Sequence, residues 1–258
     1  VYKRQLLEQP DLVDQLIILT DEQWQDLQQE GFPATQMAVI PNHLDNGNIP
    51  ANPQKVPSQT VIYLARYSEE KQHALLLSAF RKVLAVIPDA QLHTYGVGPL
   101  RRSLSAQVAE WGLAQAIHIN GFTSDIAQAH KTACCTVLCS TQEGQSISAV
   151  EAMAYGTPLI SFAIKYGPRD ILQDRQAGML VPCGDEEALA AALIKVIADK
   201  TLQQSMRQAA LCNAQRYYAS AIAEHWAAWL QASERLMAAQ AKADFGLASK
   251  SPQAASVG

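Results

Sequence analysis

Residues 134–162 read CCTVLCSTQEGQSISAVEAMAYGTPLISF, and they carry the clearest signal of the fold. Its first seven residues form an apolar run that predicts a buried strand, and LISF at residues 159–162 predicts a second strand. Residues 146–155 between them predict a helix, which Gly156 and Pro158 would end. A strand, a helix and a strand in this order predict a βαβ unit with two parallel strands.

The same alternation continues on both sides of this unit. Further strands are expected at residues 61–65, 91–95, 117–119 and 178–181, and further helices at residues 73–87, 100–111, 125–131 and 186–198. This alternation predicts an α/β fold, namely a Rossmann-like parallel sheet with helices on both faces. Ligands of such sheets bind outside the carboxyl ends of the strands, so the chemistry is expected in the turns that follow strands.

The pattern differs at the two ends of the chain. Residues 13–19, 21–30 and 37–40 predict a strand, a helix and a short strand within a separate segment, residues 1–45. Residues 46–59 are rich in Pro and Asn and predict a linker. The main domain is expected over residues 60–215, a C-terminal helix over residues 216–241 and a disordered tail over residues 242–258.

Composition excludes several classes of protein. The 258 residues carry 20 Lys and Arg against 24 Asp and Glu, and the net charge of −4 weighs against nucleic-acid binding by overall charge. With 48% apolar and 17% charged residues, the chain can bury a core. No apolar run reaches the roughly 18 residues of a membrane span. The start has neither an initiator Met nor the pattern of a signal peptide, so we expect a cytoplasmic fragment of a longer protein.

The five cysteines have no spacing typical of a metal site. They stand at positions 134, 135, 139, 183 and 212, without a C-x-x-C pair or a nearby pair of His residues. This pattern favours buried, reduced thiols over a zinc site or a disulfide framework. No metal ligands are therefore assigned.

The turn after residues 91–95 contains Gly96 and Gly98. A dinucleotide-binding fingerprint would need a third glycine where Arg101 stands, and an acidic residue about 20 positions later, where the sequence has Asn120. A nicotinamide dehydrogenase is therefore disfavoured, and the sequence has neither a P-loop nor a G-x-S-x-G nucleophile elbow. Gly96 and Gly98 could admit a ligand close to the backbone or form a plain tight turn, and both alternatives stay open.

The turn at residues 141–147 is the most informative one. Gly144 allows a sharp turn, and Ser146 can cap the helix whose first N–H groups point to the carboxyl edge of the sheet, which makes an anion site. Glu143 and Glu151 flank this site, and their carboxylates suit the hydroxyls of a sugar or ribose. For Glu151 a capping box that begins at Ser148 is an equally good interpretation.

Several landmarks in sequence order resemble one family. Glu143 and Glu151 are separated by seven residues and continue into AMAYGTPLIS, residues 152–161. Further landmarks are Ala65-Arg66 with Glu70-Lys71, Tyr95-Gly96-Val97-Gly98-Pro99, Asn120-Gly121-Phe122, Tyr166-Gly167-Pro168 and Gly178-Met179-Leu180-Val181. Together they resemble the retaining glycosyltransferases of the GT-B fold, nearest the poly(glycerol-phosphate) α-glucosyltransferases and related teichoic-acid and adhesin enzymes. The resemblance covers about residues 12–240.

The resemblance implies a role for each matching residue. Arg66 and Lys71 would neutralise the diphosphate of a nucleotide-sugar donor without a metal or other cofactor, although solvated surface charges are the ordinary alternative. Glu143 would position the transferred sugar, and Glu151 would bind the ribose. The backbone around Gly144, Gln145, Ser146 and Ile147 would hold phosphate and sugar, and Asn120 and Gly121 would line the base. The donor implied is UDP-glucose or UDP-GlcNAc.

Two departures limit the expected activity. The family's Glu-Gly-Phe-Gly is here Glu143-Gly144-Gln145-Ser146, so the loop has lost one glycine. Residues 1–45 would be only the tail of the N-terminal acceptor domain, so the chain alone is expected to bind a donor without transferring the sugar. His73 and His118 are expected to be structural, and Trp226 and Trp229 to pack in a helix that crosses back to the N-terminal domain.

The resemblance also implies the partners. These are the nucleotide sugar, the missing N-terminal domain, and a polymer or protein acceptor such as poly(glycerol phosphate); peripheral contact with a membrane face stays open. Two other functions remain as alternatives. One is a non-catalytic partner subunit of a glycosyltransferase, and the other is a sugar-nucleotide epimerase on the same fold.

Overall fold

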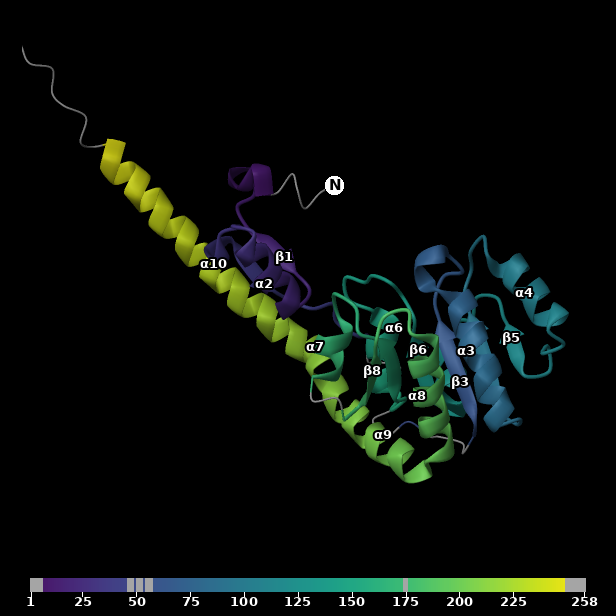
Figure 1. Cartoon of the computed structure of the whole chain (residues 1–258). Coiled ribbons are helices and arrows are strands. Elements are labelled where there is room, and N and C mark those ends of the chain that lie inside the picture. The colour runs from purple at the N-terminus through teal and green to yellow at the C-terminus, as the bar shows by residue number, and fades with distance from the viewer. Residues whose placement is uncertain (1–6, 46–48, 50–52, 54–57, 174–175, 249–258) are drawn as a thin grey trace, which may run out of the picture.

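The computed structural model describes the whole chain except residues 1–6, 46–48, 50–52, 54–57, 174–175 and 249–258. Its centre is a six-stranded sheet with the strand order β5-β4-β3-β6-β7-β8 (Figure 1). The strands are β3 (Thr60–Leu64), β4 (Gln91–Tyr95), β5 (Ile117–Ile119), β6 (Ala133–Leu138), β7 (Leu159–Phe162) and β8 (Gly178–Val181). All neighbouring strands are parallel, which confirms the predicted sheet.

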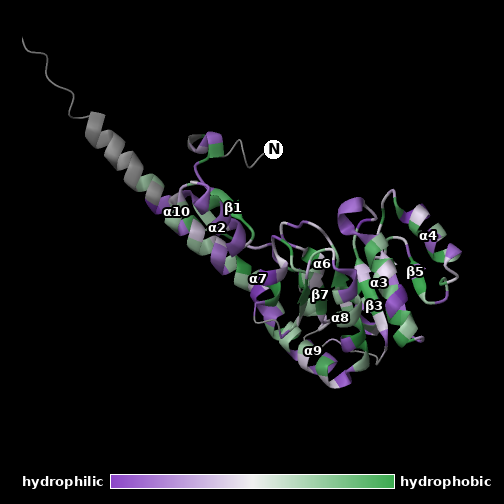
Figure 2. Cartoon of the chain, in the orientation of Figure 1, coloured by the Kyte–Doolittle hydropathy of each residue, from purple (hydrophilic) through white to green (hydrophobic). Residues whose placement is uncertain are grey.

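Helices cover both faces of this sheet, as predicted. α3 (His73–Val86) packs against α8 (Glu186–Ala198), and α6 (Ile147–Ala154) packs against α9 (Lys200–Ala214). The chain also contains α4 (Arg101–Glu110), α5 (Ile126–Thr132) and α7 (Pro168–Leu172). Right-handed crossovers that leave in opposite directions place their helices on opposite faces, so α3 and α6 lie on different sides of the sheet. The strands between these layers are strongly hydrophobic (Figure 2), and β6 is buried along its whole length.

The chain changes direction across the sheet between β3 and β6. From β3 it runs outward to β4 and β5, then returns to the other side of β3 and continues from β6 to β7 and β8. The carboxyl ends of β3 and β6 therefore lie side by side at a topological switch point. This is the place where open α/β sheets bind their ligands.

A second, smaller unit precedes this domain. β1 (Leu16–Ile18) and β2 (Met37–Val39) form a two-stranded parallel sheet, and α2 (Asp21–Gln29) connects them. Thr20 caps α2, because its hydroxyl accepts a hydrogen bond from the backbone N–H of Gln23 at 3.2 Å. A separate apolar cluster that includes Phe32 fills this unit. The predicted strand, helix and strand before the linker are thus confirmed.

The long helix α10 (Ala219–Ala248) ends the described part of the chain. Its first half passes along the N-terminal unit, where Trp229 donates from Nε1 to Oε1 of Gln15 at 3.3 Å (Figure 1). Trp226 makes an edge-to-face contact with Trp229 but remains 41% exposed. The predicted helix end at residue 241 is wrong, because the helix continues to Ala248: no Pro interrupts residues 242–248, and the single glycine there, Gly246, does not end it.

Two predicted segments fall largely on undescribed residues. Most of the predicted linker, residues 46–59, and the last part of the predicted tail, residues 249–258, lie outside the described residues.

The cysteines are free thiols, but only three of the five are buried. Cys134, Cys135 and Cys139 lie on β6 or directly after it, whereas Cys183 and Cys212 are exposed. The prediction of buried thiols is therefore wrong for these two, because Cys183 lies in the turn after β8 and Cys212 on the outer face of α9. Within the described ranges, no helix combines the length and the apolar character needed to cross a membrane.

Candidate functional site

A cavity of about 810 Å³ lies at the switch point, at the carboxyl ends of four strands. Its lining residues follow β3 (Arg66, Glu70, Lys71), β6 (Thr141, Gln142, Glu143, Gly144), β7 (Ile164, Lys165, Tyr166) and β8 (Cys183). The structure thus brings together four of the residues that the sequence analysis singled out, Arg66, Lys71, Glu143 and Gly144. Sequence reasoning had placed the site in the turns after strands, and the cavity lies there.

Lys71 and Glu143 form an ion pair in the wall of this cavity. Nζ of Lys71 lies 2.7 Å from Oε1 of Glu143, and the two side chains are only 16% and 12% exposed. The hydroxyl of Ser140 donates to the same carboxylate oxygen at 2.6 Å, and the hydroxyl of Tyr63 donates to the backbone carbonyl of Lys71 at 2.8 Å. The wall therefore presents one fixed cation and one fixed carboxylate side by side, which suits an anionic group next to a hydroxyl-bearing group.

Arg66 is held far less firmly. Its side chain is 73% exposed, and its Nη2 lies 3.2 Å from Oε1 of Glu70. The hydroxyl of Ser68 also donates to Oε1 of Glu70, and this hydrogen bond is the main cause of the lowered pKa of that carboxyl group. An exposed pair contributes little to stability, so Arg66 can turn to an anion in the cavity at small cost.

The loop between β6 and α6 is buried at its end. Ser146 is the N-cap residue of α6, as expected, but among the described residues its side chain makes no capping hydrogen bond and lies 3.2 Å from the hydroxyl of Ser148. Gln145 is buried, and its Oε1 accepts the backbone N–H of Asn42 at 2.7 Å. Ile147 is 47% exposed. The first turn of α6 thus keeps N–H groups that the cap does not occupy.

Glu151 lies one turn further along α6. Burial raises the pKa of its carboxyl group. The capping-box interpretation is wrong, because the N-cap residue of α6 is Ser146, not Ser148, and Glu151 is five residues beyond this cap instead of three. No hydrogen bond to its carboxylate occurs in the described part of the chain.

Asn120 and Gly121 lie two strands away, at the carboxyl end of β5, outside the cavity lining. The hydroxyl of Tyr67 donates to the backbone carbonyl of Asn120 at 2.6 Å, and the carbonyl of Gly121 accepts the N–H of Gly96 at 3.1 Å. These backbone contacts make a wall at the edge of the site.

Gly96 and Gly98 are explained by packing of the backbone. A Cβ atom at Gly96 would lie 2.0 Å from the carbonyl oxygen of Ala65, and one at Gly98 would lie 2.4 Å from that of Tyr67. Gly98 also has a φ of +152°. The tight-turn alternative therefore accounts for both glycines, since the close approach is to the neighbouring turn.

His73 lies between the two tyrosines that contact Lys71 in the cavity wall and Asn120 at the end of β5. Its ring lies between those of Tyr63 and Tyr67, at centroid distances of 4.7 and 4.8 Å. It is 1% exposed, and neither ring nitrogen has a hydrogen-bond partner in the described ranges. Burial, with a smaller effect of the charge on Lys71, lowers the pKa of His73 to about 4. His118 contacts Gln91 and the ring of His93 in the sheet.

Sequence reasoning missed several lining residues. Lys165 was not singled out at all, Tyr166 appeared only as part of a landmark, and Cys183 appeared only as a thiol. Their common signal is their position directly after β7 and β8, which the strand pattern alone could have indicated. In the described part of the chain, no three His, Cys, Asp or Glu side chains gather as a metal site would require.

Comparison with known proteins shows that the sequence matches a known protein family. The sequence matches the family model described as glycosyl transferases group 1 over residues 47–211. An exopolysaccharide phosphotransferase of Streptomyces coelicolor is 30% identical over 86% of this chain and 24% of its own length. The GtfA subunit of a UDP-N-acetylglucosamine–peptide N-acetylglucosaminyltransferase from Streptococcus gordonii is 30% identical over 84% of this chain and 44% of its own length. The poly(glycerol-phosphate) alpha-glucosyltransferase of Bacillus subtilis is 24% identical over 83% of this chain and 32% of its own length.

Solved structures show the same fold. A TarM mutant of S. aureus, in complex with UDP, α-GlcNAc-glycerol and fondaparinux, superposes with a TM-score of 0.78 at 23% identity. The superposition covers 87% of this chain and 45% of that one. The predicted fold class, the C-terminal half of a GT-B fold, is confirmed. The chain spans between 24% and 44% of the length of the three curated relatives.

Proposed function

The chain belongs to the glycosyl transferases group 1 family, and we propose that it is the donor-binding part of a retaining glycosyltransferase. The donor is a nucleoside diphosphate sugar, with UDP-glucose or UDP-GlcNAc as the expected ligands. The parent protein would transfer the hexose to a hydroxyl group of an acceptor such as poly(glycerol phosphate). The relatives from Bacillus subtilis and Streptococcus gordonii, whose names state such transfers, support this choice.

The Lys71–Glu143 pair beside the start of α6 carries the proposal. A diphosphate requires fixed positive charge, which Lys71, Arg66 and the dipole of α6 would supply as the leaving group gains charge. A sugar next to that diphosphate requires acceptors for its hydroxyl groups, and the carboxylate of Glu143, which Ser140 and Lys71 hold in place, would supply one. No cofactor enters this scheme.

The remaining candidate residues have supporting roles in this proposal. The backbone N–H groups of Gln145, Ser146 and Ile147 would bind phosphate and sugar, and the half-buried carboxylate of Glu151 would accept the ribose hydroxyls. The backbone wall at Asn120 and Gly121 would border the base. These roles follow the family resemblance, and the positions agree with a donor that extends from the cavity towards β5.

Calorimetric titration with UDP, UDP-glucose and UDP-GlcNAc tests the proposal. We expect the chain to bind UDP. We also expect it to bind either UDP-glucose or UDP-GlcNAc more tightly than it binds UDP alone. Arg66→Ala should weaken UDP binding, whereas Arg102→Ala, an exposed arginine on α4, is the matched control and should leave it unchanged. Absence of UDP binding at millimolar ligand would contradict the proposal.

A partner subunit without its own transferase activity is the second candidate, because the streptococcal relative is named as a subunit. Restoring the N-terminal half and changing Glu143 to Ala separates the two candidates. Loss of sugar transfer favours the enzyme, and unchanged transfer favours the partner subunit. Conversion of the donor sugar without any acceptor would instead indicate an epimerase.

A further inference from the structure

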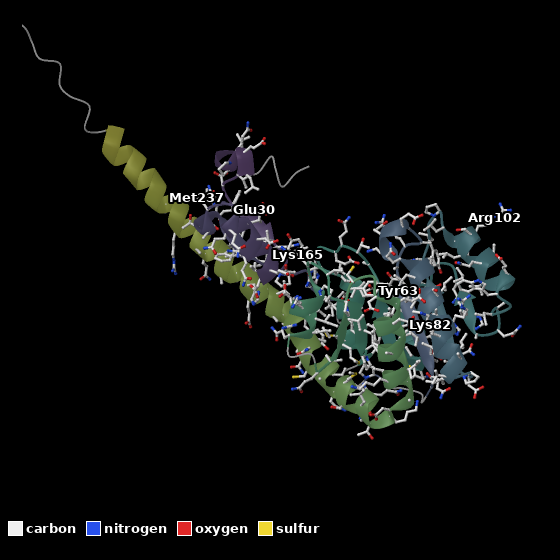
Figure 3. The ribbon with its side chains drawn as sticks, viewed as in Figure 1. Glu30, Tyr63, Lys82, Arg102, Lys165 and Met237 are labelled. Carbon is white, nitrogen blue, oxygen red and sulfur yellow. The ribbon has the colours of Figure 1, made fainter. Side chains whose placement is uncertain are left out.

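Helix α2 of the N-terminal unit contacts two of the turns that line the cavity. Its side chains contact the turn after β6 at Gly144 and the turn after β7 at Lys165 and Tyr166. Figure 3 shows Lys165 at the junction between the N-terminal unit and the main domain. The proposed function gives these contacts no role.

Gln23 bridges α2 and the loop before α6. Its Oε1 accepts the backbone N–H of Leu19 at 2.9 Å, and its Nε2 donates to the carbonyl of Gly144 at 3.3 Å. A trans peptide is planar, so fixing the Gly144 carbonyl towards α2 directs the N–H of Gln145 away from α2. Gln23 thus orients an N–H group that the proposed function assigns to the donor.

Asp26 contacts Tyr166, which binds the peptide between Glu143 and Gly144. Its carboxylate accepts the Tyr166 hydroxyl at 2.8 Å and lies 2.8 and 3.1 Å from Nζ of Lys165. The backbone N–H of Tyr166 donates to the carbonyl of Glu143 at 3.4 Å. Asp26 therefore fixes Tyr166, and Tyr166 in turn fixes the peptide between Glu143 and Gly144.

These contacts differ from ordinary packing between two units in the residues that they reach in the main domain. Lys165 is 62% exposed, and an exposed ion pair adds little to the stability of an interface. Yet the contacts converge on two successive peptides, 143–144 and 144–145. The N–H of Asn42, also from the N-terminal unit, binds Gln145 directly after them.

We propose that Gln23 and Asp26 are positioning residues of the donor site. Through them α2 fixes the loop that precedes α6, and the placement of the N-terminal unit controls how well the donor sugar is held. Loss of these contacts when the two units separate would loosen the loop and release the sugar. The inference rests on the proposed function, because it assumes that this loop binds the donor.

Binding measurements on four variants test the proposal. Gln23→Met keeps the length of the side chain without its hydrogen bonds, Asp26→Ala removes the carboxylate, and Gln25→Met is the matched control at an exposed position of α2. We expect Gln23→Met and Asp26→Ala to weaken binding of the preferred UDP-hexose about fivefold, the factor for one net hydrogen bond. Binding of UDP itself should weaken less than binding of the UDP-hexose, because Arg66 and Lys71 also hold its phosphates. Asp26→Asn keeps an acceptor for Tyr166 and should restore most of the loss.

Amide hydrogen exchange of the unliganded chain gives a second readout. Peptides that cover residues 143–148 should exchange faster in Gln23→Met than in Gln25→Met, while the melting temperature stays the same. UDP binding by the native chain, with unchanged UDP-hexose affinity and unchanged exchange in both variants, would overturn the positioning role alone. No UDP binding by the native chain would overturn the proposed function and this inference with it.

Discussion

The two halves of the candidate site are built in different ways. At the carboxyl ends of β3 and β6, side chains form the site, since Lys71, Glu143 and Ser140 hold one another in the cavity wall. At the ends of β4 and β5, the backbone forms it, through the close approach of Gly96 to Ala65. A substitution in the half built from side chains can weaken ligand binding while the fold persists. A substitution that disturbs the half built from backbone also lowers the stability of the fold.

Three rings connect these halves. Tyr63 binds the carbonyl of Lys71, Tyr67 binds the carbonyl of Asn120, and His73 lies between the two tyrosine rings. These three rings therefore form a junction between the two halves.

The largest effect is expected at the backbone half. Gly96→Ala would place a Cβ 2.0 Å from the carbonyl oxygen of Ala65, which the parallel pairing of β3 and β4 holds in place. We expect the free energy of unfolding in urea to fall by more than about 3 kcal/mol. Gly112→Ala is the control, because nothing lies near its Cβ and only its φ of +69° is strained; it should cost about 1 kcal/mol. Equal losses in the two variants would contradict the comparison.

At the side-chain half, binding should change and stability should not. The double variant Lys71→Met, Glu143→Gln removes both charges and leaves neither partner unpaired. We expect the unfolding free energy to stay within about 1 kcal/mol. UDP-hexose binding should weaken by about 100-fold or more, since two charge-assisted contacts are lost. Calorimetry and urea denaturation measure the two quantities, and a variant that is clearly less stable but keeps its affinity for UDP-hexose would contradict the prediction.

The junction should respond to pH. The pKa of His73 is lowered to about 4, so between about pH 6.5 and 4 the unfolded chain binds more protons than the folded chain. The free energy of unfolding therefore has its full value above about pH 6.5, where His73 is neutral in both states. It decreases as the pH falls, by about 2 kcal/mol at pH 5. His73→Leu should abolish this part of the pH dependence in urea denaturation. If native and variant chains lose equal stability between pH 7.5 and 5, the prediction is wrong.

The smallest effect on stability is expected at Glu151. Burial raises the pKa of this carboxyl group, so the folded state favours the protonated form, and the charge destabilises the fold above its ordinary titration range. Glu151→Gln should stabilise the chain at pH 7 by less than about 1 kcal/mol, and the gain should disappear as the pH falls below about 4.5. UDP binding should weaken in the same variant. Tighter UDP binding by Glu151→Gln would contradict the ribose role.

Much of the fold could be predicted because its signals are local. The buried run at β6, the Thr20 cap of α2 and the glycine stop after α6 depend on neighbouring residues only. α7 was missed, because five residues that begin with Pro168 carry too short a pattern. The capping box at Glu151 was wrong, because two serines fit the cap equally well and only the path of the loop selects Ser146.

The sequence was enough to predict the parallel sheet, its carboxyl edge and most of the charged residues there, since hydrophobic periodicity and turn chemistry act within a few residues. Which of these residues meet depends on the tertiary structure. It paired Lys71 with Glu143, placed His73 between two tyrosines and brought Gln23 and Asp26 to the donor loop. Such contacts join segments far apart in the chain, and the packing of the whole sheet and the N-terminal unit fixes their distances.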